Sequence, residues 1–214
     1  MPVDQPLYPV NLVLAGRPCL VVGGGRVAAA KVRGLLEAAA RVTVVAPEVG
    51  EDIAGLASAG RIALERRPYR PGDVRGHRFA VAATGDPAVN QQVYDEGEAA
   101  GVWVNSADDP ERCSATLPAR VRRGRLTVTV STGGHSPAVA AWLRGRLAAQ
   151  LGPEYDELIG VVAEVRGEVL AGGGGTEELD WQRALDSGIL ELVRAGRLEA
   201  AKERLRACLS SSSD

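Results

Sequence analysis

The sequence predicts an α/β fold in which a doubly wound parallel sheet is followed by a β-hairpin and a small C-terminal helical domain. Short β-branched runs alternate with helical patterns in the first half, two alternating runs flank a glycine at position 124, and the remainder shows helical periodicity. The chain has 214 residues, of which 45% are hydrophobic and 24% charged, so it can bury a sizeable core. Wholly disordered and collagen-like classes are excluded.

Composition also indicates the cellular location of the protein and the role of its cysteines. No apolar run approaches the roughly 18 residues that a membrane-spanning helix needs, and no secretory signal is readable at the N-terminus. Cys19, Cys113 and Cys208 are odd in number and lack CxxC spacing, so neither a disulfide framework nor a zinc site is expected. We therefore expect a cytoplasmic protein with structural cysteines, no metal site and no membrane contact.

The first part of the chain alternates strands and helices with short connections. Strands are predicted at residues 17–22, 41–46, 61–65, 78–83 and 101–105, and helices at 27–38, 53–59 and 87–100. This βαβαβ order is typical of a Rossmann-like doubly wound sheet.

The pattern changes after residue 105. Alternating runs at 115–121 and 126–131 predict an antiparallel hairpin, and helices are predicted at 138–151, 155–170, 179–193 and 198–209. Ser136 and Pro137 suit the N-cap and first position of the first of these helices. We expect three domains, at residues 1–112, 113–150 and 151–214, with a disordered serine-rich tail at 210–213.

A glycine-rich turn between the first strand and the first helix is the strongest motif. Gly23, Gly25 and Ala28 match the pattern GxGxxA. Gly23 would allow the tight turn, Gly25 the close approach of a pyrophosphate to the backbone, and Ala28 close packing of helix and strand. A purely structural glycine turn is the alternative, and we favour nucleotide binding because of the strand-to-helix context.

The end of the second strand bears on the choice of dinucleotide. In such folds an acidic residue there binds the ribose hydroxyls. Here the strand ends at Ala46 and Pro47, and the first carboxylate is Glu48. Because no arginine directly follows the strand to bind a 2′-phosphate, we expect NAD rather than NADP.

Two further loops are predicted at the same edge of the sheet. Thr84 follows the fourth strand and could touch the nicotinamide half, while Asp86 beside it could cap a helix, and both readings can hold. Asp108 and Asp109 follow the fifth strand, where a carboxylate could act as a general base. Asp-Asp-Pro is also good turn chemistry, so the spacing alone leaves both roles open.

Arginines gather in the middle of the chain. The net charge is −2, yet residues 112–150 contain arginines and no Asp or Glu, while the region after residue 150 is acidic. This basic stretch suits an anionic partner. Nucleic acid is not expected as that partner because the RVRRGR hairpin lacks interleaved aromatic residues. Trp142, at helical spacing, is expected to pack rather than to stack on a ligand.

Several segments together resemble the precorrin-2 dehydrogenase family, which also forms the first half of siroheme synthases. They are VVGGGRVAAAK, VTVVAPE, AATGDPAVNQQV, VNSADDPERCSATLPA and VSTGGHSP, and the resemblance covers residues 7–150. It implies that NAD+ accepts a hydride from precorrin-2, giving sirohydrochlorin in siroheme biosynthesis. Some members also insert Fe2+, and the sequence leaves open whether this chain does. No methyltransferase domain fits in the remaining residues.

The resemblance also implies roles for individual residues. Cofactor contacts would fall on Gly23, Gly24, Gly25, Arg26, Val27, Pro47, Glu48 and Thr84. The family's key aspartate maps to Asp108 and not to Asp109. The carboxylates of the tetrapyrrole substrate would meet Arg120, Arg122, Gly133, Gly134, His135 and Ser136. Some members carry a modifiable serine where Thr132 stands here.

Family members form homodimers through the hairpin, so a homodimer is expected, and the hairpin arginines are then either substrate ligands or solvated edge protection. A non-catalytic NAD-sensing domain is the alternative function. A sensor has no need of a basic tetrapyrrole pocket, and it would leave the spectrum of precorrin-2 unchanged in the presence of NAD+.

Overall fold

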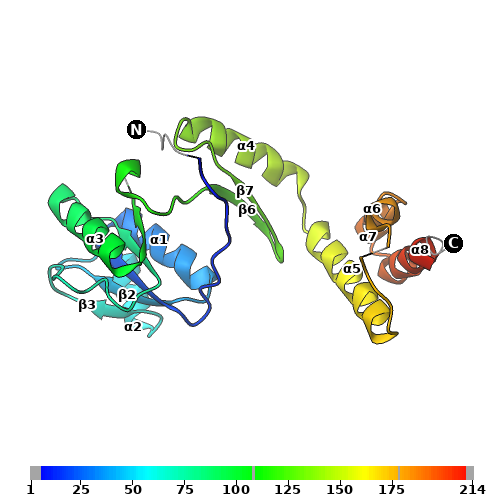
Figure 1. Cartoon of the computed structure of the whole chain (residues 1–214), viewed down its shortest axis with the longest axis horizontal. Coiled ribbons are helices and arrows are strands. Elements are labelled where there is room, and N and C mark those ends of the chain that lie inside the picture. The colour runs from blue at the N-terminus through cyan, green and yellow to red at the C-terminus, as the bar shows by residue number, and fades with distance from the viewer. Residues whose placement is uncertain (1–5, 108, 178, 211–214) are drawn as a thin grey trace. The chain divides into compact units, whose positions relative to one another are not determined.

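The computed structural model in Figure 1 describes residues 6–107, 109–177 and 179–210, which form two compact units. The first unit extends to Leu117 and includes Gly133–Ser136. The second comprises Pro118–Thr132 and the chain from Pro137 onward. Asp108 and residues 211–213 of the serine-rich tail, both subjects of sequence predictions, lie outside the described residues.

The first unit contains a parallel sheet, as predicted. Its strands are β1 (Pro18–Val22), β2 (Arg41–Val45), β3 (Ala63–Glu65), β4 (Phe79–Ala82) and β5 (Trp103–Ser106). They lie in the order β3-β2-β1-β4-β5 with every neighbouring pair parallel. The chain moves outward from β1 to β3 and then returns to the other side of β1. The strand order therefore reverses between β1 and β4, where ligands bind in sheets of this kind.

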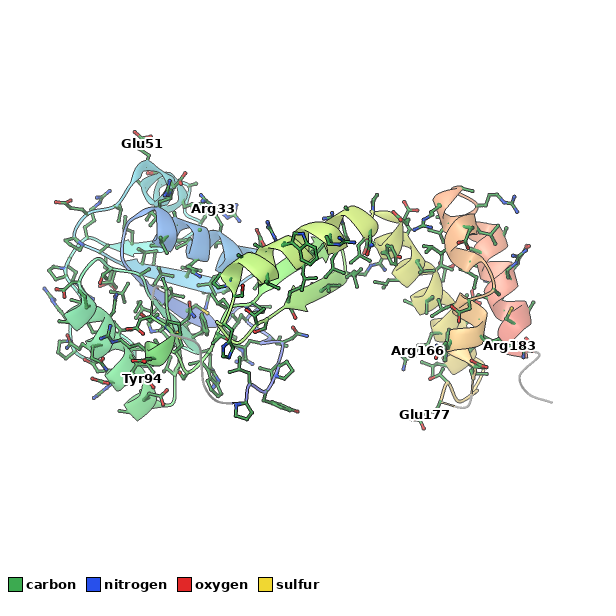
Figure 2. The ribbon with its side chains drawn as sticks, turned by 90° about the horizontal axis from the view of Figure 1, so that it is seen from above. Arg33, Glu51, Tyr94, Arg166, Glu177 and Arg183 are labelled. Carbon is green, nitrogen blue, oxygen red and sulfur yellow. The ribbon has the colours of Figure 1, made fainter. Side chains whose placement is uncertain are left out.

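Helices cover both faces of this sheet. α1 (Arg26–Glu37) and α2 (Glu51–Ser58) supply Val32 and Ile53 to one core cluster, and α3 (Pro87–Ala100) supplies Val93 to the other. Successive residues of a strand point to opposite faces, so strands buried on both sides read as continuous apolar runs. Figure 2 shows Arg33 on the side of α1 that faces α2, where its guanidinium donates to Asp52 at 3.1 Å.

The second unit begins with the predicted hairpin, formed by β6 (Ala119–Arg123) and β7 (Leu126–Val130). Gly124 takes a positive φ of 53° in the turn. The predicted start of the first strand at residue 115 is wrong for two reasons. Ala115 donates its backbone N–H to β5 of the other sheet, and Pro118 has no N–H to contribute to a ladder.

An arginine connects the hairpin to the next helix, α4 (Pro137–Gln150). The Arg123 guanidinium donates to the carbonyl oxygens of Ala148 and Leu151, at 2.9 and 2.7 Å. These carbonyls belong to the last turn of the helix, where backbone acceptors lack helical partners. Arg123 therefore caps α4 as well as fixing β6 to it.

Trp142, which was expected to pack rather than to stack on a ligand, is not buried within the described residues. Its side chain is 59% exposed on α4, and the guanidinium carbon of Arg146 lies 5.1 Å from the ring centroid. Val139, one turn earlier, is 45% exposed. Both side chains are therefore largely exposed on α4 within the described residues.

Four helices complete the second unit: α5 (Glu154–Ala171), α6 (Trp181–Leu185), α7 (Ile189–Arg194) and α8 (Leu198–Ser210). The predicted helix at 179–193 is instead two short helices, because Gly188 adopts a φ of +87° between them. Apolar side chains of all four helices form one core. No helix in the described ranges is both long and apolar enough to cross a membrane.

Ion pairs join α5 to α8 across this core. Lys202 donates to Glu164 at 2.8 Å and to Glu199 of its own helix at 2.9 Å. Arg206 makes a bidentate pair with Glu168, with both distances 2.7 Å. Exposed pairs of this kind contribute little individually, so the apolar core remains the main source of stability in this unit.

Replacing Gly97 with alanine should destabilise the first unit. Gly97 lies where α3 meets β5, and an added Cβ would clash with the Val104 side chain. We expect Gly97→Ala to lower the free energy of unfolding by about 1–3 kcal/mol in urea denaturation. Gly55→Ala on α2, where no atom lies within 4 Å of the new Cβ, should leave stability unchanged or higher. Equal effects of the two variants would contradict this packing.

Candidate nucleotide-binding site

The glycine-rich turn follows the carboxyl end of the central strand β1. The Gly23 N–H donates to the Val45 carbonyl at 3.0 Å, and the Ala83 N–H donates to the Val22 carbonyl at 2.8 Å. The chain therefore turns while it is still hydrogen bonded to both neighbouring strands. The turn lies at the point where the strand order reverses, and it leads directly into α1.

The protein itself requires two of the three glycines. Gly23 has a φ of +127°, and a Cβ at this position would clash with the Ala83 carbonyl. A Cβ at Gly24 would clash with the backbone carbonyl of Glu48. The Gly50 N–H also donates to the Gly24 carbonyl at 2.9 Å. The loop that follows β2 therefore lies directly against the turn.

The protein gives no internal reason for the third glycine. Gly25 has an extended backbone open to any residue, and no atom of the described chain lies within 4 Å of the place where its Cβ would be. Arg26 and Val27 are exposed in the first turn of α1, which carries no acidic residue. Exposed N–H groups at a helix N-terminus attract phosphates. This turn fits a pyrophosphate that approaches the backbone at Gly25.

Pro47 and Glu48 are exposed on the loop that lies against the turn. Beside them the Ala46 N–H donates to the Glu65 carbonyl at 3.1 Å, so the chain after β3 runs next to the chain after β2. This places Arg66 at the edge where such folds bind the adenosine ribose. Sequence analysis missed Arg66 because only the pairing of β2 with β3 brings it beside the loop that follows β2. Because the carboxyl ends of parallel strands lie at one edge of the sheet, the predicted strand at 61–65 could have indicated Arg66.

The next residue, Arg67, is bonded to side chains of the protein itself. Arg67 donates to both carboxylate oxygens of Asp73, at 2.6 and 2.9 Å, and also pairs with Glu65. The guanidinium holds the pKa of Asp73 below its usual value. Arg66, by contrast, is exposed and makes no ion pair within the described ranges.

Thr84 lies on the other side of the turn, after β4. Its hydroxyl donates to Asn90 Oδ1 at 2.7 Å, and Asn90 Nδ2 donates to the Thr84 carbonyl at 3.1 Å. The Asp86 side chain accepts the Ala88 N–H at 2.8 Å, so the predicted helix cap is present. Asn90 is buried, and sequence analysis missed it. These hydrogen bonds tie the loop to the start of α3, and the Thr84 backbone lies close to Gly23.

Asp109 is used to build the loop after β5. Its Oδ1 accepts the Glu111 N–H at 3.0 Å, and its Oδ2 lies 2.9 Å from an Arg112 guanidinium nitrogen. Arg112 also donates to Gln91 on α3 at 2.6 Å. Both oxygens of Asp109 thus have partners, which is the turn role that the Asp-Asp-Pro sequence suggested. Asp108, for which a proton-transfer role was predicted, lies outside the described residues.

The predicted substrate residues fall in both units. Gly133 and Gly134 have positive φ values of 59° and 82°, and His135 is exposed beside them in the first unit. Ser136 is half-buried and directly precedes α4.

Arg120 and Arg122 belong to the second unit and are exposed on one face of β6. Arginines of the basic stretch also have structural partners within this unit, and Arg122 donates to the Gly124 carbonyl at 3.3 Å. Arg125, for example, donates to Asp156 Oδ1 at 2.8 Å from both its side chain and its backbone. Within the described ranges, no three His, Cys, Asp or Glu side chains gather as a metal site would require.

The fold and the turn define a dinucleotide-binding protein, and a family model agrees. Residues 10–119, more than half of the chain, match the model described as putative NAD(P)-binding. The chain belongs to this family, and its cofactor class is a nicotinamide dinucleotide.

A second family model and individual relatives give more specific similarities. Residues 123–150 match the model described as sirohaem biosynthesis protein central. The chain is 36% identical to a siroheme synthase of Nitrosomonas eutropha over 210 residues, 97% of this chain and 44% of that protein. It is 38% identical to a siroheme synthase of Stutzerimonas stutzeri over 194 residues, 90% of this chain and 42% of that protein. The chain thus spans less than half the length of these relatives.

A solved structure resembles nearly the whole chain. It is SirC, precorrin-2 dehydrogenase, with a TM-score of 0.71 and 28% identity, covering 94% of this chain and 100% of SirC. The resemblance that the sequence motifs indicated is confirmed.

Gly25→Ala should weaken dinucleotide binding without loss of stability. The new methyl group would stand in open space that a pyrophosphate needs, so we expect the Kd for NAD+ to rise about tenfold or more in a fluorescence titration. The melting temperature should stay close to that of the wild type. Gly24→Ala should instead lower it, because that Cβ meets the Glu48 backbone. Unchanged affinity in Gly25→Ala would show that phosphate binds elsewhere.

Proposed function

We propose that this protein is an NAD-dependent precorrin-2 dehydrogenase, which converts precorrin-2 to sirohydrochlorin in siroheme biosynthesis. The observation that carries the proposal is the likeness to SirC over the whole length of that protein. The reaction removes a hydride and a proton from the macrocycle. The bound nicotinamide accepts the hydride, and a group of this chain must take the proton.

NAD is the dinucleotide that we assign. The glycine turn and the exposed Arg26 and Val27 would hold the pyrophosphate. Pro47 and Glu48 lie on the ribose side, where the Glu48 carboxylate would accept from ribose hydroxyls and would disfavour a 2′-phosphate in spite of the exposed Arg66. The backbone of Thr84 lies on the nicotinamide side of the turn.

Asp108 is the proposed proton acceptor. In the sequence it comes two residues after β5, and ligands bind beyond the carboxyl ends of strands in such sheets. Both carboxylate oxygens of the neighbouring Asp109 already have partners within its loop. This supports Asp108 rather than Asp109 as the proton acceptor.

The substrate would be held by cations and backbone donors. Arg120 and Arg122 supply guanidinium groups, which bind carboxylates in bidentate fashion. The segment from Gly133 to Ser136, with the exposed His135, would supply further contacts. A homodimer through the hairpin and α4 is part of the proposal, and the exposed Val139 and Trp142 support it. Fe2+ would be a second substrate if the protein also makes siroheme.

Replacement of the proposed base tests this function. Asp108→Asn should reduce NADH formation from precorrin-2 and NAD+ at least about a hundredfold under anaerobic conditions, because a general base is lost. NAD+ affinity should remain that of the wild type. Asp109→Asn is the matched control and should retain most of the turnover.

The same assay separates the two possible activities. A macrocycle spectrum that changes only after Fe2+ is added would identify iron insertion as a later step. A wild-type protein that binds NAD+ but forms no NADH from precorrin-2 would refute the dehydrogenase and favour an NAD sensor.

A further inference from the structure

The loop between β5 and the hairpin is closed at a narrow neck. After Ser106 the chain leaves the sheet edge, and at Ser114 it returns to it. The N–H groups of Ser114 and Ala115 both donate to the Val104 carbonyl, at 2.9 and 3.0 Å, and the Ser114 hydroxyl accepts the Val104 N–H at 2.9 Å. Residues 106–107 and 109–113 therefore belong to a loop whose two ends are held together at the edge of the sheet.

The sulfur of Cys113 joins both ends of this loop. Its Sγ accepts the N–H of Ser106 at 3.2 Å and lies 3.5 Å from Asn105 Nδ2. The carbonyl oxygens of Ser106 and Asp109 lie 3.4 and 3.3 Å from the sulfur, so the thiol proton has two acceptors within reach. One side chain thus contacts the strand end, the loop entry and the loop interior. Sulfur makes these contacts at longer distances than a hydroxyl oxygen would.

The chemistry of the thiol fits a structural contact and not a nucleophile. Burial raises the pKa of Cys113, so the group stays protonated and keeps its proton for a hydrogen bond. Cysteine ligation of a metal is also unsupported, because no cluster of three metal-binding side chains occurs within the described ranges.

Two polar atoms at the neck are buried without a partner in the part of the chain that the structure describes. They are Oδ1 of Asn105 and Oγ of Ser106, on side chains that are only 6% and 4% exposed. Unsatisfied buried polar atoms are uncommon and call for an explanation such as a functional one. Asn105 is held in this position through its Nδ2, which donates to the Ala115 carbonyl at 3.0 Å and contacts Cys113.

We propose that Cys113 is a positioning residue for proton transfer in the dehydrogenase reaction. By contacting Ser106 and Asp109, its sulfur holds the described residues that flank position 108 in the sequence. The inference rests on the proposed function, since it concerns the same reaction. Sequence analysis assigned Cys113 only as a structural cysteine.

Kinetics of cysteine variants test this role. We expect Cys113→Ala to lower kcat for NADH formation about tenfold or more, because small displacements of a catalytic group are costly. The KM for precorrin-2 and the Kd for NAD+ should change less than about twofold, since neither depends on the loop neck. Cys113→Ser retains a donor and an acceptor and should recover part of the lost kcat. Cys208→Ala, at a half-buried cysteine of α8, is the matched control and should behave as the wild type.

The outcomes separate this inference from the function on which it rests. A wild-type protein without dehydrogenase activity refutes the proposed function. An active wild type with an equally active Cys113→Ala variant refutes the positioning role alone. A parallel loss of melting temperature, NAD+ affinity and kcat in both Cys113 variants would identify a residue that only stabilises the fold, and would also overturn it. If Cys113→Ala does not fold, Cys113→Ser decides by the same comparison of kcat with NAD+ affinity.

Discussion

The site depends on a close approach of three backbone segments at the end of β1. The chain at Gly23 contacts the chain after β4, and Gly24 contacts the chain after β2. Side chains have no room at these two positions, so the loops on both sides are held against the turn by contacts of main chain with main chain. The dinucleotide surface is therefore an extension of the sheet itself. Its geometry follows from strand pairing and not from the flexible side chains that line it.

The basic middle of the chain is less uniform than its sequence. Arg112, Arg123 and Arg125 have partners within their own units, with carbonyls or carboxylates that fix loops and helix ends. Arg120 and Arg122 remain exposed along one strand face. Several arginines of this tract thus fix the fold as well as contributing positive charge.

Local pattern predicted most of the fold. The strands of the sheet, the glycine turn and the Asp86 cap could be predicted because each depends on residues close in sequence. The late start of β6 could not, since the bond between Ala115 and β5 decides it, and helical periodicity alone did not reveal the left-handed backbone at Gly188. The same holds within the site. Arg66 comes beside the chain after β2 only through pairing of β2 with β3, and the pairing of Asp109 with Arg112 requires the folded loop.

The ion pairs of α8 have a practical consequence for labelling. Lys31 and Lys202 are the only lysines in the sequence, and Lys202 is bonded to two glutamates with 14% of its side chain exposed. Amine-directed crosslinkers and biotinylation reagents will therefore find few targets on this protein. Distance restraints between its two units are better sought with reagents for carboxylates, which are abundant on the helices of the second unit, or with cysteines introduced at exposed sites.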